Sequence, residues 1–84
     1  MRVVITAEGH KQYKRLPKSE QTKIKKKLVA LENNPHAGKK LTGDYTGFRS
    51  LRAWPYRIIY SIEENQQVLT VNSIQHRQGA YRPH

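Results

Sequence analysis

The second half of the chain carries its positive charge on arginine alone. Its nine lysines all lie between Lys11 and Lys40. The cationic residues that follow are Arg49, Arg52, Arg57, Arg77 and Arg82. A guanidinium group presents a planar fork that binds phosphate through two parallel hydrogen bonds, and it stays charged at any working pH. Arginines in or beside short strand-like segments therefore predict a site for a phosphodiester backbone.

Residues of this kind could cut RNA without a metal ion. The 2′-hydroxyl of a ribose attacks the neighbouring phosphorus, while the enzyme stabilises charge on the phosphate and protonates the leaving oxygen. Arginines would neutralise the transition state, and a histidine such as His76, or a nearby arginine, would move protons. The ring of Tyr81 could stack on an unstacked base. The six acidic residues form no two-carboxylate centre, so we expect neither a metal site nor a cofactor.

These side chains must be brought together by strands. Runs of β-branched and aromatic residues predict strands over Phe48–Ala53, Tyr56–Ile62 and Gln67–Ile74. Their connections are only a few residues long, which predicts an antiparallel meander. Because a meander brings strand ends close together, we expect a set of basic residues from different strands to converge on one groove: Arg52, Arg57, His76 and Arg77.

The alternation of side chains along a strand predicts which face each residue occupies. On the middle strand, Arg57, Ile59 and Ser61 share one face. The other face, which we expect the helices to cover, carries Tyr56, Ile58, Tyr60 and Ile62.

The first half of the chain predicts a strand and two helices. Arg2–Thr6 reads as a strand, and Thr6 can cap a short helix over Ala7–Leu16, with Tyr13 and Leu16 on its buried side. After Pro17, a longer helix over 18–32 has an apolar stripe at helical spacing, formed by Ile24, Leu28 and Leu31. The segment His36–Gly47 reads as a loop. The order β-α-α-β-β-β predicts an α+β domain in which a helical hairpin packs on a mostly antiparallel sheet.

Composition narrows the function further. With 84 residues, the chain is expected to form one domain over 1–84. Its net charge of +10 is typical of proteins that bind nucleic acid, an anionic surface or an acidic partner. The lack of cysteine excludes disulfides and cysteine-based zinc sites. No apolar run reaches the roughly 18–20 residues that span a bilayer, so we expect a cytoplasmic protein that does not contact membranes.

Lysines add two further candidate RNA-binding surfaces. Lys23, Lys26 and Lys27 project from the longer helix away from its apolar stripe, and Lys39 and Lys40 lie in the loop. Together with Arg49 and Arg52 on the first meander strand, they form our candidate RNA-contacting set. Each of these residues alone is more often a solvated surface charge, and the signal lies in their combination.

Taken as a set, these segments resemble the RelE/ParE superfamily, the toxins of bacterial and archaeal type II toxin–antitoxin systems. The resemblance covers nearly the whole length. It is carried by Asn33-Asn34-Pro35, by Lys39 to Gly43, by Phe48 to Tyr60 and by Ile74 to Arg82. It implies a metal-independent endoribonuclease that cleaves mRNA in the ribosomal A site. It also implies an acidic antitoxin, encoded by a neighbouring gene, that covers the basic face of the toxin in a hetero-oligomer.

The resemblance also implies roles for individual residues. Arg57 matches the arginine that contacts the scissile phosphate, and Arg77 matches the one that protonates the leaving group or stabilises its charge. Tyr81 matches the C-terminal tyrosine that stacks on the substrate base, and Arg52 matches a basic strand position. His76 matches a site that is histidine or lysine in relatives.

The chain departs from this family at one place. Its best-known ribonucleases carry two lysines on the strand before the Tyr-Arg motif, where this chain has Phe48 and Ser50. His76 is therefore our candidate for the general base. Two alternatives stay open: a ParE-like inhibitor of DNA gyrase, and a basic module that binds RNA, including ribosomal RNA, without cutting it.

Overall fold

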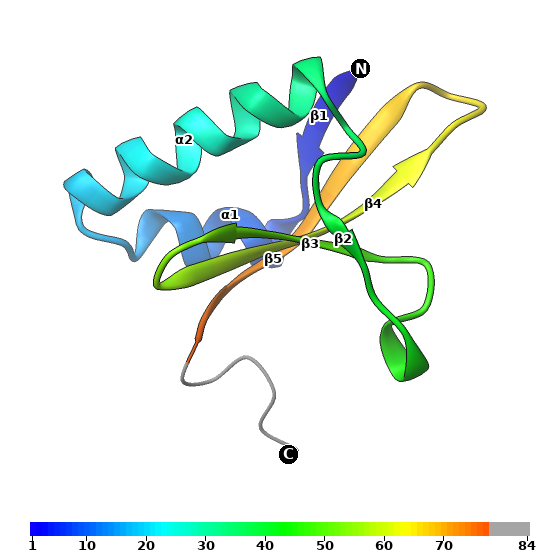
Figure 1. The fold of residues 1–84 in the computed structure, drawn as a ribbon. Helices are drawn as coiled ribbons and strands as arrows, with labels where there is room; N and C mark the ends of the chain where they lie inside the picture. Colours follow the sequence, from blue (N-terminus) through cyan, green and yellow to red (C-terminus); the bar gives the residue numbers. More distant parts are fainter. Residues whose placement is uncertain (78–84) are drawn as a thin grey trace.

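A computed structural model describes residues 1–77 and places two helices against one face of a five-stranded sheet (Figure 1). The elements in chain order are β1 (Arg2–Ile5), α1 (Ala7–Lys14), α2 (Lys18–Asn33), β2 (Lys39–Lys40), a 3-10 turn η1 (Gly43–Tyr45), β3 (Arg49–Ala53), β4 (Tyr56–Glu63) and β5 (Val68–His76). The strands lie in the order β1-β5-β4-β3-β2. Only the β1–β5 pair is parallel among the strands of the described residues. The predicted α+β class and mostly antiparallel sheet are confirmed.

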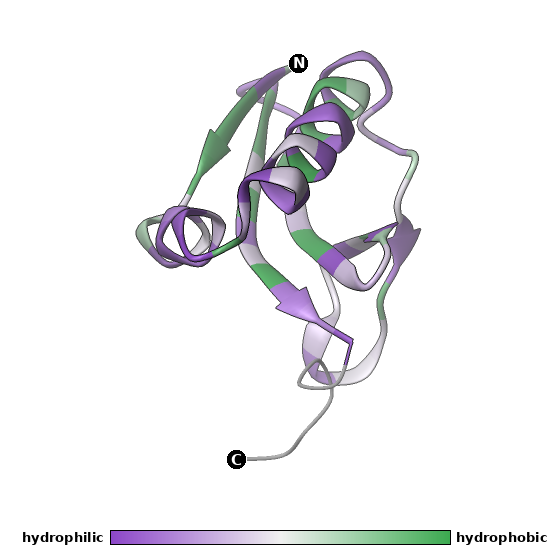
Figure 2. Ribbon diagram, turned by 90° about the vertical axis from the view of Figure 1, so that its left-hand side faces the viewer, coloured by the Kyte–Doolittle hydropathy of each residue, from purple (hydrophilic) through white to green (hydrophobic). Residues whose placement is uncertain are grey.

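The prediction that His36–Gly47 is a loop throughout was wrong at β2. Lys39 pairs with Ser50 and Lys40 pairs with Arg49, so two lysines close the free edge of β3. Lysine on an edge strand discourages pairing with another sheet. A pair of lysines has no alternating apolar pattern, so only its partner strand reveals this pairing. In Figure 2, hydrophilic β2 and hydrophobic β1 form the two opposite edges of the sheet.

Side-chain hydrogen bonds hold the helical hairpin, and the predicted cap at Thr6 is one of them. The Thr6 hydroxyl accepts a hydrogen bond from the Gly9 amide at 3.1 Å and donates one to the Asn72 carbonyl at 2.9 Å, so it caps α1 and ties it to β5. The side-chain amide of Gln21 donates to the carbonyls of Tyr13 and Leu16, which closes the turn before α2.

The core lies between the helices and the sheet. Ile24 and Leu31 of α2 are fully buried, and Leu28, Tyr13 and Leu16 pack against the same cluster. The sheet contributes the predicted face of β4: Ile58 and Tyr60 are buried in this cluster, and Tyr56 and Ile62 pack against it. The face assignment made from alternation on β4 is therefore confirmed. None of the helices in the described part of the chain is long and apolar enough to cross a membrane.

The pairing of β4 with β5 has one irregularity. Ile59 lies opposite Ser73, whereas the next residue, Tyr60, lies opposite Val71. Asn72 is thus an extra residue on β5, as in a β-bulge. This bulge and the extension of β5 to His76 set the face on which each residue near the end of β5 lies.

Candidate functional site

Two arginines face each other on the side of the sheet that the helices leave open. Arg52 on β3 lies directly opposite Arg57 on β4, and Gln75 on β5 continues the row. Cross-strand neighbours of this kind have Cβ atoms roughly 4.5–5.5 Å apart. Ile58, the next residue on β4, faces the helices, so Arg57 points away from them. The structure therefore brings Arg52 and Arg57 together, as their sequence positions predict.

A third cation joins them through β2. A shallow pocket of about 130 Å³ is lined by Lys39, Leu41, Ser50, Arg52 and Arg57. Lys39 is adjacent to this row because it pairs with Ser50, which in turn lies opposite Ile59. No carboxylate belongs to this lining among the described residues. The pocket therefore combines three positive charges with a buried serine, which suits a phosphate group.

The loop that leads into β2 is held by a buried tyrosine. The Tyr60 hydroxyl accepts a hydrogen bond from the Gly38 amide at 2.8 Å and donates one to the Pro35 carbonyl at 2.8 Å. Burial raises the pKa of Tyr60 above its ordinary value of 10.0, and this effect exceeds the opposing effects of the Gly38 hydrogen bond and the Arg49 charge. The neutral phenol therefore holds residues 35–38 in place and, through them, positions Lys39.

Arg49 serves the same loop. It lies opposite Tyr60, so it is on the helix side of the sheet and not with Arg52 and Arg57. Its Nη1 atom donates to the Gly38 carbonyl at 2.9 Å. Arg49 therefore lies on the other face of the sheet from Arg52 and braces the loop, and its predicted contact with RNA stays a prediction.

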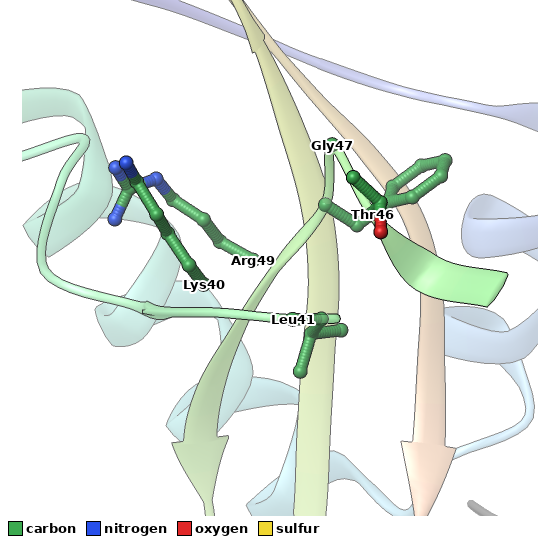
Figure 3. Close-up of a pocket in the computed structure, with 6 residues that line it drawn as sticks. Lys40, Leu41, Thr46, Gly47 and Arg49 are labelled. Atoms are coloured by element: carbon green, nitrogen blue, oxygen red, sulfur yellow. The ribbon is translucent and has the colours of Figure 1, made fainter. Parts of the chain in front are cut away.

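Lys40 lies beside Arg49 at a separate pocket of about 280 Å³. Figure 3 shows the charged ends of Lys40 and Arg49 pointing to the same side, whereas Leu41 points the other way. Lys39 and Lys40, predicted as one basic pair, therefore face different pockets. Only Lys39 lines the pocket that contains Arg52 and Arg57.

His76 does not join the two arginines. It lies opposite Tyr56 in the strand register, and the two rings meet edge to face with centroids 5.3 Å apart. Tyr56 packs against the core on the helix side of the sheet. The predicted convergence of His76 with Arg57 is therefore wrong. A shift of one residue in the pairing of β4 with β5 reverses the face on which His76 lies, and the sequence does not reveal this register.

Arg77 lies one step beyond β5. Its amide donates to the Pro55 carbonyl at 2.8 Å, so the pairing of β4 and β5 continues past their ends. Alternation then returns Arg77 to the side of Gln75 and Arg57. Its guanidinium lies over the indole ring of Trp54, 4.7 Å from the ring centroid. Arg77 thus lies near the same end of the sheet, in contact with an aromatic ring.

The lysines of α2 divide into two groups. The Lys23 ammonium is 3.3 Å from a Glu20 carboxylate oxygen and donates to the Trp54 carbonyl at 2.9 Å, so it braces the β3–β4 turn. These contacts are with Glu20 and the β3–β4 turn, and the predicted contact of Lys23 with RNA stays a prediction. Lys26 and Lys27 are exposed, as predicted.

The stacking role predicted for Tyr81 lies outside the described residues. Within residues 1–77, no group of three histidine, aspartate or glutamate side chains could hold a metal ion. Sequence reasoning missed the contribution of Lys39 to the arginine pocket. Trp54 is 54% exposed.

Comparison with known proteins gives consistent results. Residues 3–81 match a family model described as the ParE toxin of the type II toxin–antitoxin system parDE. The chain is 34% identical over 82 residues to a curated protein named Toxin RelE from Mycobacterium tuberculosis (strain ATCC 25618 / H37Rv), covering 95% of this chain and 84% of that one.

Solved structures share the fold. The toxin–antitoxin complex RelBE2 from Mycobacterium tuberculosis contains a chain that matches with a TM-score of 0.84 at 23% identity, covering 90% of this chain and 96% of that chain. The archaeal RelE–RelB complex from Pyrococcus horikoshii OT3 contains a chain that matches with a TM-score of 0.78 at 27% identity, covering 90% of this chain and 93% of that chain.

Proposed function

The chain belongs to the ParE toxin family of type II toxin–antitoxin systems, within the RelE/ParE superfamily, and from this we propose that it is a metal-independent endoribonuclease that cleaves mRNA on the ribosome. The observation that carries the proposal is the open-face pocket shared by Arg52, Arg57 and Lys39. Cleavage of RNA requires positive charge at the scissile phosphate, and this pocket supplies it.

In the proposed reaction, the scissile phosphate lies in this pocket. The ribose 2′-oxygen forms a bond to phosphorus while the bond from phosphorus to the 5′-oxygen breaks. The 2′-hydroxyl proton passes to water, and the 5′-oxygen takes up a proton. Arg57 and Arg52 offset the negative charge that grows on the phosphate oxygens, because a guanidinium binds two such oxygens at once. The products are a 2′,3′-cyclic phosphate and a 5′-hydroxyl end.

Lys39 is our candidate for the general acid, a role that the resemblance implies for Arg77, and water replaces His76 as the acceptor of the 2′-hydroxyl proton. The Lys39 ammonium group belongs to the pocket lining and can donate a proton to the departing 5′-oxygen. His76 lies on the other face beside Tyr56 and has no part in this scheme. Arg77 adds positive charge at the end of the sheet. Tyr81 remains proposed to stack on the substrate base.

The basic charge also implies a partner. We propose an acidic antitoxin that binds this chain as a hetero-oligomer, and its gene is expected next to that of the toxin. The matching structures include complexes named for a toxin and its antitoxin. An antitoxin that places carboxylates over the pocket would block phosphate binding, and complementary charge would speed its association at low salt.

The test uses purified full-length protein and ribosomes that carry a defined mRNA. We expect protein that has been treated with EDTA to cleave the mRNA and to leave a 2′,3′-cyclic phosphate at the new 3′ end. Intact mRNA together with gyrase-linked DNA breaks in cells would instead favour the gyrase inhibitor. RNA binding with a steep salt dependence and no cyclic phosphate would favour a module that binds without cutting.

A further inference from the structure

We propose that the indole ring of Trp54 is a stacking platform for an unstacked RNA base next to the phosphate held by Arg52 and Arg57. This inference rests on the proposed function, since it names a further substrate contact of the same site. It is carried by the exposure of Trp54, by the contacts that brace it, and by the charges around it.

Trp54 is more exposed to solvent than is usual for a tryptophan in a folded domain. The residue is 54% exposed, although tryptophan usually buries most of its large apolar surface. It forms the turn between β3 and β4 together with Pro55, at the end of the sheet that lies beneath the first turns of α2 (Figure 1). An exposed aromatic ring at a strand end is available for a ligand with a flat face.

The turn is braced at several points, so the ring is held and not merely exposed. The Lys23 ammonium donates to the Trp54 carbonyl at 2.9 Å, and the Arg77 amide donates to the Pro55 carbonyl at 2.8 Å. The Arg77 guanidinium lies 4.7 Å from the centroid of the indole ring. A cation over one side of the ring also orders the indole. A ring that is already ordered loses little conformational entropy when a base stacks on it.

The position of Trp54 relates it to the phosphate pocket. Arg52 lies two residues before Trp54 in β3, and Arg57 lies three residues after it in β4. The turn therefore extends directly from the two strands that carry the arginines. A nucleotide whose phosphate lies between Arg52 and Arg57 would have its base, or that of its neighbour, near this turn.

The charges nearby favour RNA over an apolar protein segment as the occupant. Arg77 lies over the indole ring, Lys23 contacts the turn from α2, and Arg52 and Arg57 form the second cross-strand pair from the turn. An apolar side chain from a partner would desolvate these charges without pairing them. A nucleotide supplies both a phosphate for the arginines and a π-face for the indole, and every base has such a face.

The chain contains one tryptophan, so its intrinsic fluorescence reports on Trp54 alone. The probe is a short single-stranded RNA with 2′-O-methyl groups, which can bind but cannot be cut. Three measurements are made on full-length protein: tryptophan quenching by this RNA, quenching by the same strand with abasic sites, and affinity from the anisotropy of labelled RNA. The variants are Trp54→Phe, Trp54→Leu and, as a matched exposed aromatic, Tyr45→Leu.

We expect the RNA to quench the fluorescence strongly and the abasic strand to quench it weakly. Trp54→Leu should bind RNA roughly 5- to 140-fold more weakly, the range expected for loss of one base–aromatic stack. Trp54→Phe keeps a ring and should bind close to wild type, and Tyr45→Leu should also bind close to wild type. A Trp54→Leu affinity equal to wild type, or equal quenching by the abasic strand, would overturn the inference.

Parallel cleavage assays separate the two proposals. If wild-type protein cleaves mRNA and Trp54→Leu binds and cleaves equally well, the stacking inference fails and the ribonuclease stands. If wild-type protein stacks RNA on Trp54 but does not cleave mRNA, the platform stands and the ribonuclease fails. A Trp54→Leu variant that loses affinity for an acidic protein partner but not for RNA would overturn the inference.

Discussion

Arg52 and Arg57 lie directly opposite each other on β3 and β4, with both side chains on the face of the sheet that the helices leave uncovered. Like charges in this relationship destabilise a sheet. A phosphate between the two guanidinium groups would attract both of them, which is why this pair indicates a phosphate site more strongly than either arginine alone.

The first prediction concerns the effect of this arginine pair on the stability of the fold. Arg52→Thr should raise the free energy of unfolding by about 0.2–1 kcal/mol, because it removes a like-charge contact and keeps a good strand former. The same variant should lose cleavage activity. Urea unfolding followed by circular dichroism measures the stability.

Arg2→Thr is the matched control, because Arg2 lies opposite Val68 and not opposite a cation. It should not be stabilised. If Arg52→Thr is less stable than wild type, the two guanidinium groups do not repel one another in the folded protein.

The second prediction concerns the tyrosine that holds the loop before β2. Tyr60→Phe removes the partner of the buried Gly38 amide, so the free energy of unfolding should fall by about 1–3 kcal/mol. Tyr45→Phe, at an exposed ring, should change it little. Chemical denaturation of both variants measures this, and equal stabilities would show that the Tyr60 hydrogen bonds contribute nothing.

A dependence on pH follows from the same residue. Burial raises the pKa of Tyr60 above 10.0, so the folded state holds this proton more tightly than the unfolded state. The contribution of the protonated Tyr60 to the free energy of unfolding is fully present below the pKa of the unfolded state. It is lost as the pH rises through the pKa of the folded state. The stability of wild type should therefore fall more steeply above about pH 10 than that of Tyr60→Phe, in unfolding curves at a series of alkaline pH values.

The third prediction tests how closely the loop approaches the sheet. A Cβ atom at Gly38 would lie 2.5 Å from the Tyr60 hydroxyl oxygen, so Gly38→Ala must displace the ring or the loop. We expect a loss of about 1–3 kcal/mol, as for other overpacked sites. Lys39→Ala at the next, exposed residue should stay within about 0.5 kcal/mol of wild type. Tolerance of Gly38→Ala would mean that this contact is loose.

The fourth prediction is a small effect. His36 and Glu64 approach to 3.1 Å, but their side chains are 54% and 62% exposed. Exposed pairs contribute about 0–1 kcal/mol, so Glu64→Gln should barely change the melting temperature. A large loss in a thermal unfolding scan would show that this pair, and not Tyr60, holds the loop.

The sequence predicts what depends on local pattern. The cap at Thr6, the apolar stripe of α2 and the alternating faces of β4 all follow from spacing along the chain. It does not predict what depends on pairing between distant strands. The edge strand β2, with its two lysines on different faces, exists only because β3 is its neighbour.

The same limit explains the error at His76. An imidazole at the end of the strand beside Arg57 could transfer protons, which is why the sequence indicates His76. The bulge at Asn72 shifts the register of β5, however, and places His76 opposite Tyr56. Lys39 is the converse case. It is 18 residues before Arg57 in a segment that reads as a loop, and only the β2–β3 pairing brings it to the arginine pocket.

The most direct test of the proposed active centre compares Arg57→Ala with His76→Ala in cleavage of mRNA on programmed ribosomes, with folding verified by circular dichroism. If the chemistry takes place on the open face, Arg57→Ala should slow cleavage by about 10²–10³-fold, the usual effect of removing one transition-state donor, and His76→Ala should cleave at nearly the wild-type rate. Full activity in Arg57→Ala, with activity lost in His76→Ala, would contradict this account and place the reaction on the other face of the sheet.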